Sequence, residues 1–474
     1  MIIGFFYCRV VSSNVESRDD AKLIESLEHL AYEIKRTIDE GLSHGRLKQE
    51  DMAWVCWKVR EFKYGDDGPT DKGISFQRTV KKDWYNAFLA VNSEIGNSKA
   101  RKAIVEELKS VFGEQVNDGH LNGFVQTIIF DYLSSNKFDI IQVASLARRL
   151  LADLRGEPTT LGTRILLDGI ILRPEKIEIA ERTILRRTVK EDLEVEEREM
   201  FALYQPSRFN IRPAAVLTIE FLSSRPFELW LKIEQALALL RLFRVGSIRY
   251  SSYYLYSDST MGFPSGLTTQ RDNAPVLDKY IIQEEDVKQF AVFWNYFSDK
   301  LPKSLYWPTG SEDHTTIAYK RYVDGLMQNG VAERRIANAI MGLEALLLKP
   351  QERQGVLRKL RTGTGKLLSN LKYEKVEVID TINDAYEIRS TFVHGGQLND
   401  SSRKKLEDRY RQIGILTRSV LDYLRICILV YLTLQMDKDT FINLIDVSPS
   451  DEKSEEQLES VLDAAKDVLG ITNA

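Results

Sequence analysis

The chain has few cysteines and few histidines. Its 474 residues include three cysteines and five histidines. The cysteines, Cys8, Cys56 and Cys427, lie far apart in apolar surroundings, which argues against a disulfide framework and a zinc knuckle. No histidine has a metal-ligand spacing to another histidine or to a cysteine. We therefore expect neither a metal site nor a cofactor.

Long hydrophobic runs are also missing. The run near the C-terminus, Ile426 to Leu434, is well short of the ~20 residues that a membrane span requires. The apolar start of the chain, MIIGFFYCRVV, has neither a preceding basic segment nor a small-residue cleavage site, so we expect a strand there and not a signal peptide. Together with the scarcity of cysteine, these patterns predict a cytoplasmic protein that does not enter membranes.

The chain also has no surplus of positive charge. It carries 65 lysines and arginines against 69 acidic residues, for a net charge of −4. This balance argues against a protein that binds nucleic acid over its whole surface, so any such ligand must be held by a local basic patch.

Hydrophobic periodicity divides the chain into three regions and predicts a multidomain α+β fold. Residues 1–155 combine helical patterns with a strand near Met52 to Phe62, which predicts a mixed α/β domain of unknown role. Residues 156–305 contain short alternating runs, which predict a β-rich domain that senses a trigger or recruits a substrate. Residues 306–474 have a helical period throughout, which predicts an all-α bundle closed by an acidic, loosely packed tail.

Four helices are expected in this bundle, after a linker at Leu301 to Glu312 that contains proline and glycine. Their predicted ranges are Thr315 to Met327, Ala332 to Leu348, Val376 to His394 and Ser402 to Gln435.

One expected strand of the β-rich region, Ile248 to Ser257, contains four tyrosines, at positions 250, 253, 254 and 256. Exposed tyrosines could form a binding face. Alternation along a strand more often reflects half-buried packing, and we favour that interpretation.

The strongest candidates for chemistry are Arg389 and His394, near the end of the third predicted helix. An imidazole exchanges protons near neutral pH, and a guanidinium holds a phosphate through paired hydrogen bonds as negative charge builds up in the transition state. Such a pair can cleave a phosphodiester without a metal. The spacing alone is weak evidence, because roughly one accidental match is expected in a chain of this composition.

The setting of the two residues is more informative than their spacing. Val378, Ile382, Ala385, Ile388 and Phe392 follow one apolar arc of the helix, and Arg389 falls on that arc. His394 ends the helix beside two glycines that are suited to a cap, where the negative end of the helix favours a positive charge. The two side chains point about 140° apart on a straight helix, so we expect a composite site at a homodimer interface.

The bundle resembles a HEPN domain, in particular the ApeA-like group. The resemblance covers residues 311–436 and rests on the four-helix pattern, the segment Ala339 to Leu347 and the motif from Arg389 to His394. It implies a bundle that dimerises and a metal-independent endoribonuclease. His394 would act as general acid or base, Arg389 would stabilise the phosphorane, and the products would carry 2′,3′-cyclic phosphate and 5′-hydroxyl ends.

Two further residues are expected to support this site. Many family members have Asn, Asp or His directly after the arginine, whereas this chain has Ser390, which lies one turn before His394 and could orient its imidazole. Glu344 is the lone acid in an apolar run and either pairs with Arg389 or lies at a solvated edge. Asn338 is expected to point away from the core and outside the site.

A basic stretch without acidic residues follows the second helix and is the candidate RNA-binding patch. It contains Arg353, Arg358, Lys359, Arg361, Lys366 and Lys372. The alternative is an ordinary exposed helix and loop. Its Gly363 to Lys366 segment is no nucleotide loop, because Leu360 and Leu367 stand where a P-loop requires glycine and a hydroxyl residue.

Two functions follow from these observations. The first is an RNA-cutting effector of prokaryotic antiviral defence or of a toxin system, in which the N-terminal 300 or so residues respond to a trigger or partner. The second, motivated by Ser390, is a non-catalytic HEPN module for dimerisation or for binding RNA or nucleotides.

Overall fold

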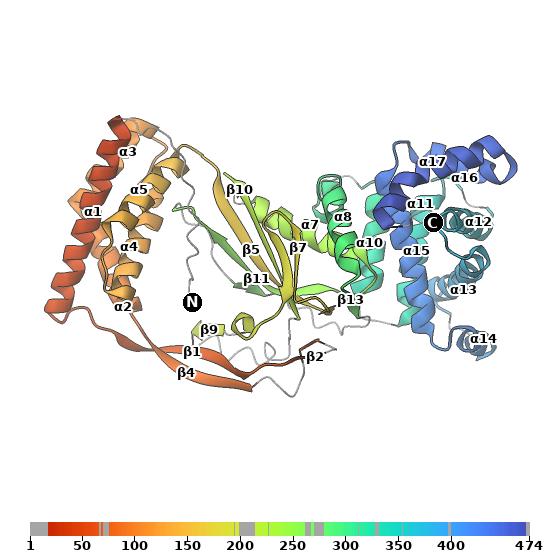
Figure 1. Cartoon of the computed structure of the whole chain (residues 1–474), viewed down its shortest axis with the longest axis horizontal. Helices are drawn as coiled ribbons and strands as arrows, with labels where there is room; N and C mark the ends of the chain where they lie inside the picture. The colour runs from red at the N-terminus through yellow and green to blue at the C-terminus, as the bar shows by residue number, and fades with distance from the viewer. Residues whose placement is uncertain are drawn as a thin grey trace.

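The structure is a computed structural model of the whole chain. It describes residues 18–470 except 66–67, 70–74, 194, 199–213, 226, 261–266, 270–278, 311, 328–330, 353 and 397–399. Figure 1 shows a helical unit at one end, an antiparallel sheet in the middle and a helical bundle at the other end. This arrangement agrees with the expected α+β class. The strand expected at the start of the chain lies outside the described residues.

The N-terminal helices enclose a hydrophobic core of their own, which includes Leu30, Phe124 and Leu150. They are α1 (Arg18–Ser43), α2 (Tyr85–Gly96), α3 (Lys99–Phe112), η1 (Asp118–Leu121), α4 (Asn122–Ser135) and α5 (Ile140–Leu154). Because the apolar positions of α1 and α5 recur with helical period, each helix buries one face in this core.

A long ribbon leaves these helices (Figure 1). Strand β1 (Glu50–Glu61) contains most of the range expected from the sequence and pairs antiparallel with β4 (Ser75–Asp83) and with β9 (Val195–Arg198). The short strands β2 (Tyr64–Gly65) and β3 (Gly68–Pro69) pair with each other. The N-terminal region is therefore a helical unit that carries a β-ribbon.

The central sheet has six strands in the order β12-β11-β5-β10-β8-β7, with antiparallel neighbours throughout. Their bounds are β5 (Thr159–Asp168), β7 (Lys176–Ala180), β8 (Thr183–Arg187), β10 (Ala215–Ser223), β11 (Arg249–Ser257) and β12 (Leu267–Thr269). A separate parallel pair joins β6 (Ile170–Leu172) to β13 (Tyr280–Ile282), and η2 (Lys190–Leu193) follows β8.

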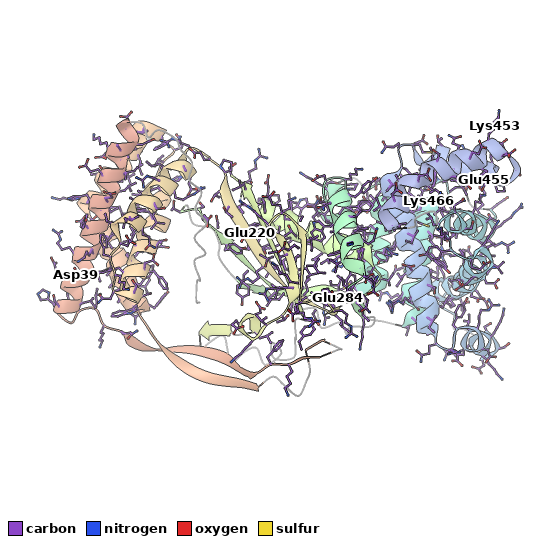
Figure 2. All side chains as sticks on the ribbon, in the orientation of Figure 1. Asp39, Glu220, Glu284, Lys453, Glu455 and Lys466 are labelled. Carbon is purple, nitrogen blue, oxygen red and sulfur yellow. The ribbon has the colours of Figure 1, made fainter. Side chains whose placement is uncertain are left out.

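The tyrosines of β11 do not share one face. Tyr250 and Tyr253 lie opposite Leu167 and Ile165 on the core side, because the register shifts between Tyr250 and Ser252. Tyr256 lies on the other side, where its ring covers Gly162 and its hydroxyl donates to Glu220 over 2.7 Å. Glu220 is labelled on the sheet in Figure 2. The strand is thus half-buried, as the sequence indicated, and its tyrosines do not form a single binding face.

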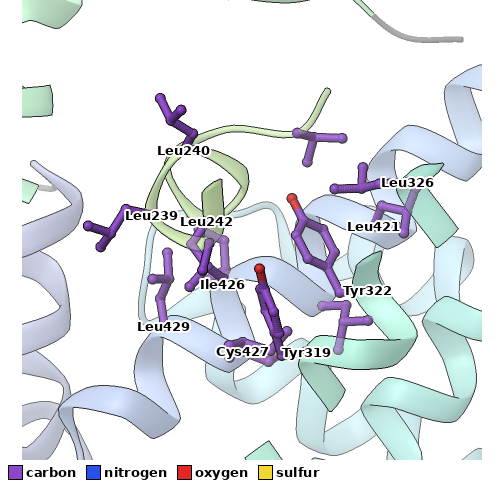
Figure 3. Close-up of a cluster of buried hydrophobic side chains, with 14 of the residues drawn as sticks. Leu239, Leu240, Leu242, Tyr319, Tyr322, Leu326, Leu421, Ile426, Cys427 and Leu429 are labelled. Atoms are coloured by element: carbon purple, nitrogen blue, oxygen red, sulfur yellow. The ribbon is translucent and has the colours of Figure 1, made fainter. Parts of the chain in front are cut away.

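The sheet and the C-terminal bundle share one continuous hydrophobic core, which extends from Leu161 to Val468. Helices α7 (Glu228–Phe243) and α8 (Asp286–Ser298) belong to it. Figure 3 shows Leu242 of α7 beside Ile426, with Tyr319 and Tyr322 next to them. The expected linker takes part as well, since α9 (Lys303–Tyr306) buries Leu305. The core therefore continues across the boundary expected near residue 305.

Three of the four helices expected in the bundle are confirmed almost to the residue: α10 (His314–Met327), α11 (Ala332–Leu347) and α13 (Lys375–Val393). The basic stretch forms a further helix, α12 (Val356–Ser369). The prediction of one long helix from Ser402 to Gln435 is wrong. The segment instead forms two helices, α14 (Asp400–Tyr410) and α15 (Ile413–Thr433). They are separated at Arg411, whose φ of 59° is left-handed and ends a helix.

The acidic tail is packed and not loose. It forms α16 (Lys438–Val447), η4 (Ser448–Ser450) and α17 (Glu452–Leu469). Leu458 and Leu462 of α17 are buried in the shared core, and Gln289 of α8 donates to the carbonyl of Val468. Glu455, on the first turns of α17 (Figure 2), pairs with Lys366 of α12. Within the described ranges, no helix combines the length and the apolar character needed to cross a membrane.

Candidate functional site

The candidate site lies at the C-terminal end of α13. This helix begins at an N-cap, Glu374, whose carboxylate accepts from the backbone N–H of Val376, and it buries Val378, Ile382 and Ile388. It ends at His394, where the backbone N–H of Gly396 donates to Thr391 over 2.9 Å. Gly395 has a φ of 72°, a left-handed conformation that glycine adopts without strain. The glycines therefore do cap the helix, as the sequence suggested.

Arg389 turns inward from the apolar side of α13. Its side chain is 23% exposed, and one terminal nitrogen donates to Glu344 of α11 over 3.1 Å. Its guanidinium carbon lies 5.7 Å from the ring centre of Tyr386. The Nε atom of the same guanidinium is buried and has no hydrogen-bond partner among the residues that the structure describes. Glu344 thus holds the group through one terminal nitrogen, while the Nε donor stays unused.

Glu344 makes the contact with Arg389 that the sequence left as one of two alternatives. Its side chain is 19% exposed, so Glu344 does not lie at a solvated edge, which was the other alternative. Burial raises the pKa of Glu344, whereas the charge of Arg389 and the hydrogen bond from it act in the opposite direction. A partly desolvated carboxylate of this kind orients a guanidinium, which is a positioning role.

His394 lies at the surface, in contrast to Arg389. It follows the last helical residue, and its backbone N–H donates to the carbonyl of Ser390 over 3.3 Å. No hydrogen bond joins the Ser390 hydroxyl to the imidazole in the described structure. The expected orienting contact from Ser390 is therefore not formed in this conformation of the chain.

The structure does not bring Arg389 and His394 into contact within one chain. Arg389 faces α11, whereas His394 is exposed beyond the end of α13. Next to His394, the apolar side chains of Phe392 and Val393 are 37% and 51% exposed. The divergence agrees with the angle expected from helical geometry, and the composite site between two chains remains a prediction.

The expectation for Asn338 is wrong. The residue is 4% exposed, and its side-chain oxygen accepts from Arg321 over 3.3 Å. A helical wheel assumes one buried face, but α11 is enclosed by α10, α13 and α15 on several sides. Asn338 nevertheless stays outside the site, since its partner is on α10 and not on α13.

The expected RNA-binding patch is partly neutralised within the chain. Lys359 pairs with Glu352, and Lys366 pairs with Glu455. Arg358 is exposed and Arg361 is partly exposed, and neither forms an ion pair with any residue that the structure describes. Arg353 lies outside the described residues. The patch on α12 is therefore much weaker than the sequence suggested.

The glycines of this segment are packing residues of α12. Gly363, Thr364 and Gly365 are buried inside the helix, and a Cβ atom on Gly365 would lie 3.0 Å from the side chain of Ile379. A nucleotide loop is thus absent here, as expected. In the described ranges, no three histidine, cysteine, aspartate or glutamate side chains are grouped to hold a metal ion.

The sequence did not draw attention to Asp384, which is 5% exposed on α13. It accepts from Arg409 over 2.5 Å and from the hydroxyl of Tyr410 over 2.9 Å. These bonds fix the end of α14 against α13, close to the break at Arg411. Since the partners are 25 and 26 residues away in sequence, no local pattern could have revealed them.

Comparisons with family models, with curated proteins and with solved structures find no match for this chain. The resemblance to HEPN domains is thus supported by none of these comparisons and rests on the sequence pattern alone.

Proposed function

We propose that the chain is a metal-independent endoribonuclease of the HEPN type, with Arg389 and His394 as its catalytic residues. The supporting observation is the state of Arg389. A guanidinium on the apolar side of a helix has a buried Nε without an acceptor, although such an unmade hydrogen bond costs about 1–3 kcal/mol. The side chain is 23% exposed, so a scissile phosphate would reach the accessible donors of the guanidinium, while Glu344 holds the group in place.

The reaction needs only proton transfers and charge stabilisation. His394 takes the proton of the ribose 2′-hydroxyl, the 2′-oxygen attacks phosphorus, and the bond to the 5′-oxygen breaks as that oxygen receives a proton. Arg389 neutralises the extra negative charge on the phosphorane. Because the two side chains diverge in one chain, the arginine of one protomer works with the histidine of its partner in a homodimer.

The decisive test is RNA cleavage by the full-length protein in EDTA. Wild type is expected to cut RNA to products with 2′,3′-cyclic phosphate ends, and His394→Ala is expected to lower the rate at least 100-fold with an unchanged fold and dimer. His44→Ala is a matched control, since His44 is an exposed histidine of the N-terminal unit. Equal cleavage by wild type and His394→Ala would refute the proposal.

A composite site makes a second measurement available. Arg389→Ala and His394→Ala homodimers are each expected to be inactive, whereas a mixture that exchanges subunits is expected to regain activity, because mixed dimers contain one intact site. Inactive mixed dimers, with an active wild-type dimer, would contradict the shared site.

One observation favours the alternative of a non-catalytic module. The described structure contains no hydrogen bond that orients the imidazole of His394, and Ser390 does not supply one. Under this alternative, Arg389→Ala changes RNA or nucleotide binding and wild type yields no RNA product. The N-terminal unit and the sheet would then respond to a trigger or partner by changing binding, whereas in a defence or toxin effector they would control cleavage.

A further inference from the structure

Helix α14 begins six residues after His394 and contacts α13 through side-chain hydrogen bonds. Arg409, near the end of α14, donates to Asp384, whereas Ser402, near its start, donates to Glu387 over 3.0 Å. Ser402, which is nearer the start of α14, thus contacts Glu387, which is nearer the C-terminal end of α13. The first turns of α14 therefore lie beside the end of α13 that carries His394. Figure 1 shows α14 next to α13 at the edge of the bundle.

These first turns carry three consecutive cations, Arg403, Lys404 and Lys405. All three are exposed. None of them forms an ion pair with the part of the chain that the structure describes. Arg409, in contrast, lies on the same helix and is paired with Asp384. Three cations thus face solvent on the helix that follows His394, at successive angles of about 100° around its axis.

The stability of α14 does not explain this placement. The helix dipole acts mainly within the first and last turns, where Asp400 and Arg409 suit it. Arg403 precedes Glu407 and Lys404 precedes Asp408 by four residues, which is the less favourable order for a helical ion pair. The three cations are therefore not needed for the stability of α14, and contact with an anion would give them a role.

The rival cationic surface is α12. There Lys359 and Lys366 are bound to Glu352 and Glu455, so the chain itself satisfies them. Binding a phosphate with these lysines would first require breaking their ion pairs. The cations of α14 can contact phosphates without such a loss.

We propose that Arg403, Lys404 and Lys405 bind the phosphate backbone of the RNA strand that reaches His394. The ligand is an RNA strand recognised through its phosphodiester groups, without base readout. This inference rests on the proposed function and names the surface that holds the substrate for that site.

The test measures binding separately from cleavage. The full-length His394→Ala protein is titrated with a fluorescent single-stranded RNA at several salt concentrations. Adding the triple substitution Arg403→Gln, Lys404→Gln, Lys405→Gln is expected to lower the slope of log K against log salt by about 2, since each phosphate contact on a single strand contributes about 0.7. Affinity at low salt is expected to fall roughly tenfold or more.

The matched control is Arg358→Gln with Arg361→Gln on α12, which is expected to change the affinity and the slope little. Both variants replace exposed or partly exposed side chains, so their melting temperatures are expected to stay close to that of the parent. Unchanged affinity and slope in the α14 variant, a larger loss in the α12 variant, or no RNA binding by the parent would each overturn the inference.

Cleavage in EDTA by the same proteins without His394→Ala distinguishes the two proposals. If wild type cuts RNA but binding does not depend on α14, the inference fails alone. If binding depends on α14 but wild type never cuts RNA, the proposed function fails and the binding surface stands.

Discussion

The N-terminal helices and the C-terminal bundle are both helical, but they meet the central sheet in different ways. The bundle shares the core of the sheet, where Leu242 of α7 lies beside Ile426 of α15 (Figure 3). The N-terminal helices have a separate core, and hydrogen bonds connect them to the residues that follow β11. Asp153 of α5 accepts from the Ser259 hydroxyl over 3.1 Å and from the backbone N–H of Thr260 over 2.7 Å.

This difference has a consequence for how the molecule transmits a signal. A large shared hydrophobic core makes the sheet and the bundle one cooperative unit. Polar contacts of a few groups break at much lower cost, so the N-terminal helices can shift against the end of β11 while both cores stay intact, as far as the pairing of β1 with β9 allows. A trigger sensed by this unit would then act on the sheet, which is rigidly joined to the helices that carry Arg389 and His394.

Leu242→Ala tests the shared core and has the largest expected effect. Leu242 is fully buried, so the loss of its side chain is expected to lower the free energy of unfolding by about 2–5 kcal/mol. Calorimetry of the full chain is expected to show that the transition of the sheet and bundle moves down as one, while a second transition stays in place.

Leu30→Ala is the matched control in the separate core, where Leu30 is also fully buried. It is expected to move only the other transition. If Leu242→Ala lowers both transitions equally, or if sheet and bundle unfold in separate steps, the division into one shared and one separate core is wrong.

Gly123→Ala tests the contact between the N-terminal unit and the sheet. A Cβ atom at this position in α4 would lie 1.7 Å from the backbone oxygen of Thr260, which cannot move without shifting the chain after β11. Overpacking of this kind lowers the free energy of unfolding by about 1–3 kcal/mol. Hydrogen exchange is expected to show faster exchange of the Thr260 amide, which Asp153 protects in the wild type.

Gly96→Ala is the control, because no atom lies within 4 Å of a Cβ atom added there. It is expected to leave exchange at Thr260 unchanged. Unchanged exchange at Thr260 in Gly123→Ala as well would mean that the two parts are not joined at this contact.

The sequence predicted best those parts of the fold that local periodicity determines. The helices α10, α11 and α13 follow from apolar positions that recur every three or four residues. The break at Arg411 did not show in the periodicity, and the bond beside it, from Tyr410 to Asp384, comes from another helix. The packed tail was missed for a similar reason: the sparse apolar positions of α17 find partners on distant elements such as α8.

The candidate site shows the same limit. Arg389 could be selected because a charged residue on an apolar arc is unusual, and its pairing with Glu344 was one of two alternatives. The neutralisation of Lys366 could not be foreseen, since its partner Glu455 is 89 residues away. The cations of α14 attract no attention in the sequence, because two acidic residues, Glu407 and Asp408, follow them after a single leucine.

Glu344→Gln has the smallest expected effect and tests whether the bundle holds Arg389 with a charged partner. Burial raises the pKa of Glu344, so the folded chain keeps this proton at a higher pH than the unfolded chain, whose value is about 4.3. The stabilising contribution is complete below the unfolded value and is lost as the pH rises through the folded value. Wild type is therefore expected to lose a small part of its stability through this group as the pH rises from 4 to 7.

Urea unfolding at a series of pH values measures this loss. Glu344→Gln keeps an oxygen that can accept from Arg389 but cannot ionise, so its stability is expected to vary less with pH than that of wild type. Glu333→Gln, on the same helix, is the control and is expected to retain the wild-type dependence. If Glu344→Gln also retains it, the carboxylate is not desolvated in solution, and Arg389 is held by a solvated ion pair that adds little to its orientation.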